Sequence, residues 1–179
     1  MRWVARFALI AVLVFSGCYT LGPITPTYMK GVHSLSVPIF ANKSFEPQVQ
    51  AVITDTFIKE LQTDGTYPIT GEDEADAIVY GTVTDVIRTQ TKSVVGDVLA
   101  SAEFQITLKI HIQVLRGDNG KPVAAGQPSS AGQLLVNKDF SGQAYFFVGS
   151  DIATQERQAI PIAAQDCAKQ VTAFLTEGF

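Results

Sequence analysis

Side chains that could perform catalysis are sparse in this sequence. The histidines are His33 and His111, and no H-x-x-x-H, H-E-x-x-H or C-x-x-C spacing gathers ligands of the kind that metal sites recruit. The G-x-S-x-G elbow of a serine hydrolase is absent, and so are the phosphate-binding motifs G-x-x-x-x-G-K-[ST] and G-x-G-x-x-G. We therefore expect no catalytic residues, no metal site and no cofactor, so the protein is not expected to be an enzyme.

Two other groups of side chains could bind a ligand. An acidic cluster, Glu72 to Asp76, offers the oxygen ligands that calcium prefers, but it lacks the EF-hand spacing and equally fits a solvated turn. An aromatic group could form a binding surface and comprises Phe140, Tyr145, Phe146 and Phe147. Adjacent residues of a strand point to opposite faces. One of Phe146 and Phe147 is therefore expected in the core, and the other beneath a helix, a loop or a partner.

The amino terminus carries a covalent-modification signal. Two arginines, nine consecutive apolar residues at 7–15 and a Ser-Gly-Cys ending at Cys18 follow one another. The apolar run is far shorter than the ~20 residues that span a membrane, but it fits the hydrophobic region of a secretory signal. Small residues directly before Cys18 resemble the bacterial lipobox, although Phe15 stands where Leu is usual. This resemblance implies cleavage before Cys18 and attachment of acyl chains such as palmitate, two or more of which give stable membrane anchoring.

The sequence predicts three segments: a signal peptide at 1–17, a lipidated tether at 18–31 with Pro23 and Pro26, and one domain at 32–179. Removing residues 1–17 leaves 11 basic residues (13 − 2) against 17 acidic ones, a net charge of −6. This balance gives no reason to expect a nucleic acid partner. In enterobacterial lipoproteins an Asp after the Cys retains the protein in the inner membrane, and Tyr19 here favours the outer membrane.

Hydrophobic periodicity predicts an α+β domain: two helices on one face of a mostly antiparallel sheet of about four strands. The expected helices cover 46–64, with Ser44 as a possible N-cap, and a C-terminal segment capped by Ser150 or Asp151. Pro161 is expected to kink or split the second helix. The expected strands are 33–40, a short one at 67–70, 77–90, 101–116 and 133–147.

The C-terminal helix and the 101–116 strand show the clearest patterns. The helix is expected to bury Ile160, Ala164, Cys167, Val171, Phe174 and Leu175. The strand is expected to bury Phe104, Ile106, Leu108, Ile110, Ile112 and Val114, with His111 on its wet face. Cys167 then reads as a small buried hydrophobe rather than a reactive thiol.

The segment from Thr91 to Ala100 joins two strands that would each reach ~50 Å, longer than a small domain usually covers. Its tip is therefore expected to project beyond the helices, unless the strands bend. The tip could instead be an ordinary hairpin whose valines fold back on the core. If it projects, it would contact an anionic amphiphile or a barrel wall through Arg88, Lys92, Val94 and Val98.

Three segments together resemble the LptE family, outer-membrane lipoproteins of lipopolysaccharide assembly, in the form found outside the enterobacteria. They are G-C-Y-T-L-G from Gly17, V-P-I-F-A-N-K-S-F-E-P from Val37, and E-A-D-A-I-V-Y-G-T-V from Glu74. The family usually has G-C-G-Y at the first site. The resemblance implies two helices on about four strands and a lipoprotein facing the periplasm or inside a barrel lumen. It also implies an LptD-type β-barrel and lipopolysaccharide as partners, and no catalytic residues.

A second interpretation stays open. Short α+β domains with E-A-D-A strands also occur in other periplasmic binding or scaffold lipoproteins of cell-envelope and secretion assemblies. An envelope hydrolase is a third interpretation, which the missing catalytic constellation disfavours.

Overall fold

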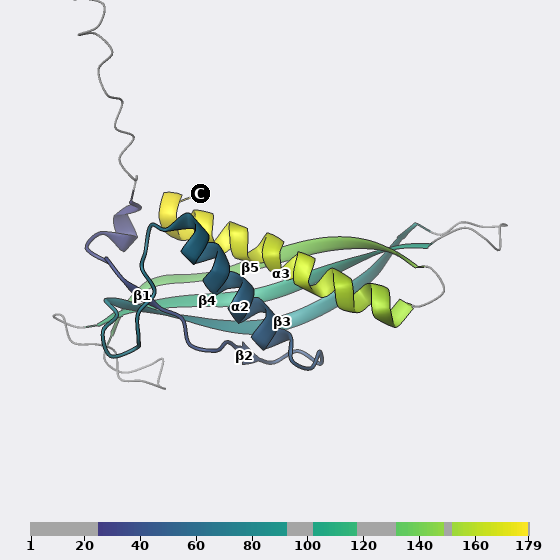
Figure 1. The fold of residues 1–179 in the computed structure, drawn as a ribbon, viewed down its shortest axis with the longest axis horizontal. Helices are drawn as coiled ribbons and strands as arrows, with labels where there is room; N and C mark the ends of the chain where they lie inside the picture. Colours follow the sequence, from purple (N-terminus) through teal and green to yellow (C-terminus); the bar gives the residue numbers. More distant parts are fainter. Residues whose placement is uncertain (1–24, 93–101, 118–131, 149–151, 179) are drawn as a thin grey trace, which may run out of the picture.

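The computed structural model describes residues 25–92, 102–117, 132–148 and 152–178 (Figure 1). Two helices lie on one face of a twisted sheet, which confirms the expected α+β class. The elements in chain order are η1 (Thr27–Met29), β1 (Leu35–Ser36), β2 (Ala41–Asn42), α2 (Val49–Asp64), β3 (Ala77–Lys92), β4 (Ala102–Gly117), β5 (Gly132–Val148) and α3 (Ile152–Glu177).

The sheet has five strands rather than about four, and its main order is β1-β3-β4-β5. The long strands β3, β4 and β5 are antiparallel neighbours, whereas β1 and β2 both pair with β3 in parallel. A single strand over 33–40 is therefore wrong: residues 37–40 between β1 and β2 are not in a strand. Pro38 lies in this gap and has no N–H to donate to a ladder. The short 67–70 strand is reduced to one bridge, between Leu35 and Ile69.

The first helix begins later than the sequence pattern indicates. Its N-cap is Gln48 at a left-handed φ of 63°, so Ser44 is not the cap. Asn42 instead holds the preceding loop: its Oδ1 accepts the Ser44 N–H at 2.9 Å, and its Nδ2 donates to the Glu46 carbonyl at 2.7 Å. These local bonds compete with helical bonding over 43–47 and delay the start of α2.

Helix α3 runs without interruption through Pro161, so the expected split is absent (Figure 1). Pro161 has no N–H to donate to the backbone carbonyl one turn earlier in the helix. Because Pro161 is exposed, that carbonyl can bond to water instead. The expected apolar face is confirmed, because Ile160, Ala164, Cys167, Val171 and Leu175 are buried. None of the helices in the described residues is long and apolar enough to cross a bilayer.

Helix α3 touches the sheet most closely at Gly142 of β5. A Cβ on Gly142 would lie 2.1 Å from the Ala163 carbonyl oxygen and 2.5 Å from the Cys167 nitrogen. Only a glycine leaves room for the helix backbone to approach this far. Gly142 therefore fixes how deeply α3 sits on the sheet and which of its faces turns outward.

We predict that Cys167 is unreactive in the folded protein. Burial, and secondarily the Asp166 carboxylate, raise the pKa of its thiol to about 12. The thiolate that attacks alkylating reagents is then nearly absent at pH 8. The pKa of Cys167 in the folded protein lies above that of an exposed thiol. The contribution of this thiol to stability is therefore expected to be lost as the pH rises from ~8.5 towards 12. Iodoacetamide labelling followed by mass spectrometry should modify Cys167 in denaturant and leave it unmodified in buffer; rapid labelling in buffer would contradict this.

Candidate binding surface

The domain has two ends of different character, set by the direction of α3. The tether enters beside the carboxyl end of α3, where the Tyr28 ring stacks on Phe174 with centroids 5.2 Å apart. The Tyr28 hydroxyl also donates to the Phe174 carbonyl oxygen. The 26 residues of α3 span ~39 Å at 1.5 Å per residue. The amino-terminal end of α3, which we call the distal end, is thus ~40 Å from the tether along the helix, and Figure 1 shows it at the opposite end of the domain.

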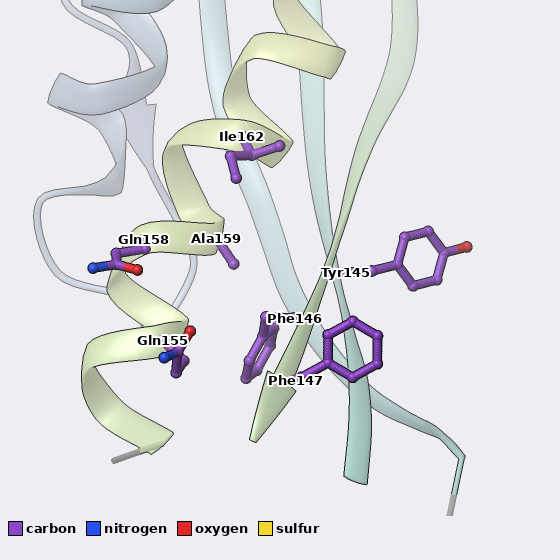
Figure 2. A pocket seen from close by; sticks show the side chains of 7 residues that line it. All are labelled: Tyr145, Phe146, Phe147, Gln155, Gln158, Ala159 and Ile162. Carbon is purple, nitrogen blue, oxygen red and sulfur yellow. The ribbon is translucent and has the colours of Figure 1, made fainter. Parts of the chain in front are cut away.

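A groove of about 380 Å³ lies at the distal end, between β5 and α3. Figure 2 shows Phe146 pointing toward the helix, while Tyr145 and Phe147 point away from it. Ile162 is 56% exposed, Tyr145 56% and Phe147 61%. The lining residues are Tyr145, Phe146, Phe147, Gln155, Gln158, Ala159 and Ile162. We call this feature the distal groove.

Strand alternation accounts for the positions of the aromatic residues. Phe140 and Phe146 belong to the buried core, and Phe146 stacks on Phe104 across the ladder with centroids 5.7 Å apart. Tyr145 and Phe147, of opposite parity, lie on the sheet face away from the helices. The prediction that Phe146 and Phe147 face opposite ways is confirmed, and Phe147 is the one whose ring remains exposed.

Sequence reasoning did not identify Ile162, Gln155 and Gln158 as binding candidates. Ile162 is a large apolar residue outside the buried stripe of α3, and this is the signal that marks it in the sequence. Its position in the groove depends on the rotation of α3 on the sheet, which a periodicity pattern leaves open.

Arg88 lies at the distal end, on the side of the sheet that carries the helices. Its guanidinium pairs with Glu46, from the loop before α2, and with Glu156 of α3. Burial alone would lower the pKa of Arg88, but hydrogen bonds to the two carboxylates outweigh it and raise that pKa. Arg88 thus ties three elements together. Lys92 ends β3, whereas Val94, Val98 and Cys18 lie outside the described residues, so their predicted roles stay predictions.

We predict that Arg88→Ala lowers the free energy of unfolding by about 1 kcal/mol, because it leaves two partly buried carboxylates without their cation. The side chain of Arg88 is 40% exposed, so salt should screen the interaction. Urea unfolding in low and high salt measures this, with Thr89→Ala as the control on the neighbouring exposed residue. An equal loss at both salt concentrations would show that the ion pairs contribute nothing.

The sheet face away from the helices, called here the open face, is polar along its middle. His111 and Asp139, opposite each other on β4 and β5, have Nδ1 and Oδ1 2.6 Å apart. The Gln105 amide donates to Gln143 at 2.6 Å. His111 therefore lies on the wet face, as expected. No cluster of three metal-binding side chains occurs in the described residues.

Strand β5 forms the sheet edge beside the helix, and one of its edge amides is capped. The Gln143 N–H donates to Asp166 Oδ2 at 2.9 Å, and Gln170 donates to the same oxygen at 3.2 Å. Capping an edge amide in this way hinders another strand from pairing there. The distal groove lies beyond this cap, toward the start of α3.

Comparison with known proteins shows likeness of fold only. No family model matches the sequence, and no curated protein matches it. A hypothetical protein from Chlamydia trachomatis is similar in structure, with a TM-score of 0.51 and 7% identity over 81% of this chain and 98% of its own. A Xanthomonas campestris protein of family DUF330 has a TM-score of 0.50 and 11% identity over 90% of each chain. A minor lipoprotein from Acinetobacter baumannii has a TM-score of 0.46 and 12% identity over 82% of this chain and 93% of its own.

Proposed function

We propose that this protein is a lipid-anchored, non-catalytic binding protein of the bacterial cell envelope, which holds a partner at its distal groove. The observation that carries this proposal is the placement of half-exposed Tyr145, Phe147 and Ile162 around a groove ~40 Å from the tether. Exposed apolar groups gathered around a groove are typical of interaction sites. The anchor holds one end of the domain at the membrane, and the other end is left to meet the partner.

The anchor is the first part of the proposal, and it rests on the Ser-Gly-Cys sequence ending at Cys18. Six residues separate Cys18 from Thr25, where the described structure starts, so the two are seven steps apart along the chain. An extended segment of that length reaches ~25 Å. The tether end of the domain therefore stays close to the membrane, and Tyr19 favours the outer membrane.

We predict that the mature protein begins at an acylated Cys18. Intact-mass measurement of protein extracted from native membranes should give residues 18–179 plus the mass of two or three acyl chains. Cys18→Ala should abolish acylation and leave a folded protein that is soluble or uncleaved, because the described core begins at Met29. An unacylated mass, or a mature chain starting at another residue, would contradict this.

The finer form of the proposal is an LptE-type role, in which the protein plugs and helps assemble an LptD-type β-barrel and assists delivery of lipopolysaccharide. The 37–47 segment that carries the resemblance supports it. Phe40 fills the space beside Gly81, and Asn42 and Glu46 hold the loop. Phe45, by contrast, is fully exposed at 104%, and Ile39 is 70% exposed. These two apolar side chains are free to meet a partner on the β2 side of the sheet.

The broader alternative is a binding or scaffold lipoprotein of another envelope or secretion assembly. It requires the anchor and the distal groove but no barrel. The fold is compatible with both roles, since one fold hosts many functions.

A mild-detergent pull-down of the tagged, full-length protein from its native membrane tests the proposal. Ile162→Asp places a charge in the groove, and Gln165→Asp, on the exposed side of the same helix, is the matched control. We expect a specific partner that Ile162→Asp loses and Gln165→Asp keeps. A large β-barrel with co-eluting lipopolysaccharide supports the LptE-type role, and a different envelope protein supports the alternative. A partner set that Ile162→Asp leaves unchanged would overturn the proposal.

A further inference from the structure

The open face carries a patch of side chains that begins at the rim of the distal groove and extends across the strands beyond it. Tyr145 and Phe147 stand on this face of β5, and both rings are more than half exposed. Gln105 lies directly across the ladder from Tyr145, and Thr107 lies across from Gln143. On the next strand Thr89 lies across from Gln105. Aromatic rings, amides and hydroxyls from three strands thus lie side by side.

The amide groups of the patch are oriented and only partly used. The Gln105 Nε2 donates to the Gln143 Oε1 at 2.6 Å, which fixes both side chains. Each amide has further donor and acceptor capacity. In the described part of the chain neither side-chain amide makes another hydrogen bond, so the Gln105 oxygen and the Gln143 nitrogen are available to a ligand.

The charge on this face disfavours phosphorylated headgroups. Its charged residues are matched across the ladders: Lys109 lies across from Asp85, Lys92 lies across from Glu103, and His111 bonds to Asp139. An anionic phosphate would be repelled by these carboxylates and would have to displace them from their basic partners. A neutral ligand with many hydroxyls meets no such repulsion, and carboxylates can accept hydrogen bonds from its hydroxyls.

The open face is also long enough for an extended ligand. A hollow of about 530 Å³ lies further along the same strands, lined by Thr84, Lys109, Asp139, Phe140 and Ser141. Ser141 is four residues along β5 from Tyr145, so the hollow is ~13 Å away at ~3.3 Å per residue. This spacing fits successive rings of a chain-like ligand better than one small molecule.

We propose that the open face binds a neutral oligosaccharide chain. The pyranose ring of a sugar has an apolar C–H face, which suits the exposed rings of Tyr145 and Phe147, and an equatorial rim of hydroxyls, which suits paired amides. Tyr145 and Phe147 take one sugar residue by stacking, and Gln105 and Gln143 bond its hydroxyls. The hollow lined by Lys109 and Asp139 takes residues further along the chain. This site shares Tyr145 and Phe147 with the rim of the distal groove, but its amides lie outside that groove, and sugar binding does not depend on the groove partner.

Saturation-transfer NMR with three lipid-free hexasaccharides, of β-linked glucose, α-linked glucose and β-linked N-acetylglucosamine, tests this inference on the mature-length protein. We expect transfer to the ring protons of at least one of them, with a dissociation constant of about 1 mM. Tyr145→Ala with Phe147→Ala should weaken that binding about tenfold or more. Gln105→Ala should also weaken it.

Two controls make the result decisive. Leu134→Ala changes a similarly exposed apolar side chain near the other end of β5, 50% exposed, and should leave sugar binding unchanged. The exposed positions of Tyr145 and Phe147 mean that their removal should not shift the unfolding temperature, which circular dichroism checks. Absence of transfer to all three sugars at roughly 5 mM would overturn the inference. So would binding that survives the Tyr145→Ala and Phe147→Ala double change. A failed pull-down at the distal groove leaves this inference untouched, so the two proposals fail separately.

Discussion

Gly142→Val is expected to destabilise the domain by about 3 kcal/mol or more, because overpacking against backbone cannot be relieved by a side-chain rotation. The Cβ alone would stand 2.1 Å from the Ala163 carbonyl oxygen, and two further methyl groups add to the overlap. Helix α3 would have to lift from the sheet and uncover Ala163, Cys167 and Val171. Urea unfolding followed by circular dichroism measures the loss.

Gly71→Val is the matched control for this change. No heavy atom lies within 4 Å of a Cβ placed on Gly71, and its φ is not left-handed. It should therefore change stability by about 0.5 kcal/mol at most. If Gly142→Val proves as stable as Gly71→Val, then α3 does not sit on the sheet at the depth described here.

Ile110→Asp is the second change with a large expected effect, and it should leave little folded protein. Ile110 is 1% exposed, at the centre of β4 and between the sheet and the helices. The aspartate would lose the apolar contacts and place a carboxylate among buried apolar side chains, a cost of about 4 kcal/mol or more. Loss of soluble expression, or a collapse of the unfolding midpoint, is the expected result.

Ile110→Val is the conservative companion, expected to cost about 1 kcal/mol because it removes one methylene from a packed core. Lys109→Ala, at the next position on the open face, should be close to neutral. Similar stability of Ile110→Asp and Lys109→Ala would contradict the assignment of the buried face.

The main elements could be read from the sequence where one face of an element is uniformly buried. Strand β4 alternates strictly from Phe104 to Val114, and its period of two identifies both the strand and its core face. The buried stripe of α3 is equally regular. Hydrophobic periodicity does not identify very short strands. Strands β1 and β2 have two residues each, and they are separate strands because each pairs with a different part of β3, with the Pro38 segment between them.

The candidate site could be predicted only in part. Strand parity separates Phe146 from Phe147 without any structure. The pairing of Arg88 with Glu46 and Glu156 joins residues 42 and 68 positions apart along the chain, and no local pattern reveals contacts of that separation. The place of Ile162 in the groove depends on the contact between Gly142 and α3. These features arise from tertiary packing.

The two carboxylates beside Arg88 bear on its predicted role as a contact for an anionic ligand. An anionic ligand at Arg88 would have to displace Glu46 and Glu156 or bind beside them, at a cost that an unpaired arginine would not incur. A lipid contact at this residue is therefore expected to be weaker than one at an unpaired cation.

The central claim is that the distal groove holds an envelope partner while the opposite end is anchored. Photo-crosslinking in living cells tests it most directly, with a crosslinking amino acid at Ile162 and, as control, at Thr63 on the exposed side of α2. The account predicts a discrete, identifiable adduct from position 162 that is lost when Cys18→Ala abolishes the lipid anchor, and none from position 63. No adduct at 162, or the same adducts from both positions, would contradict it.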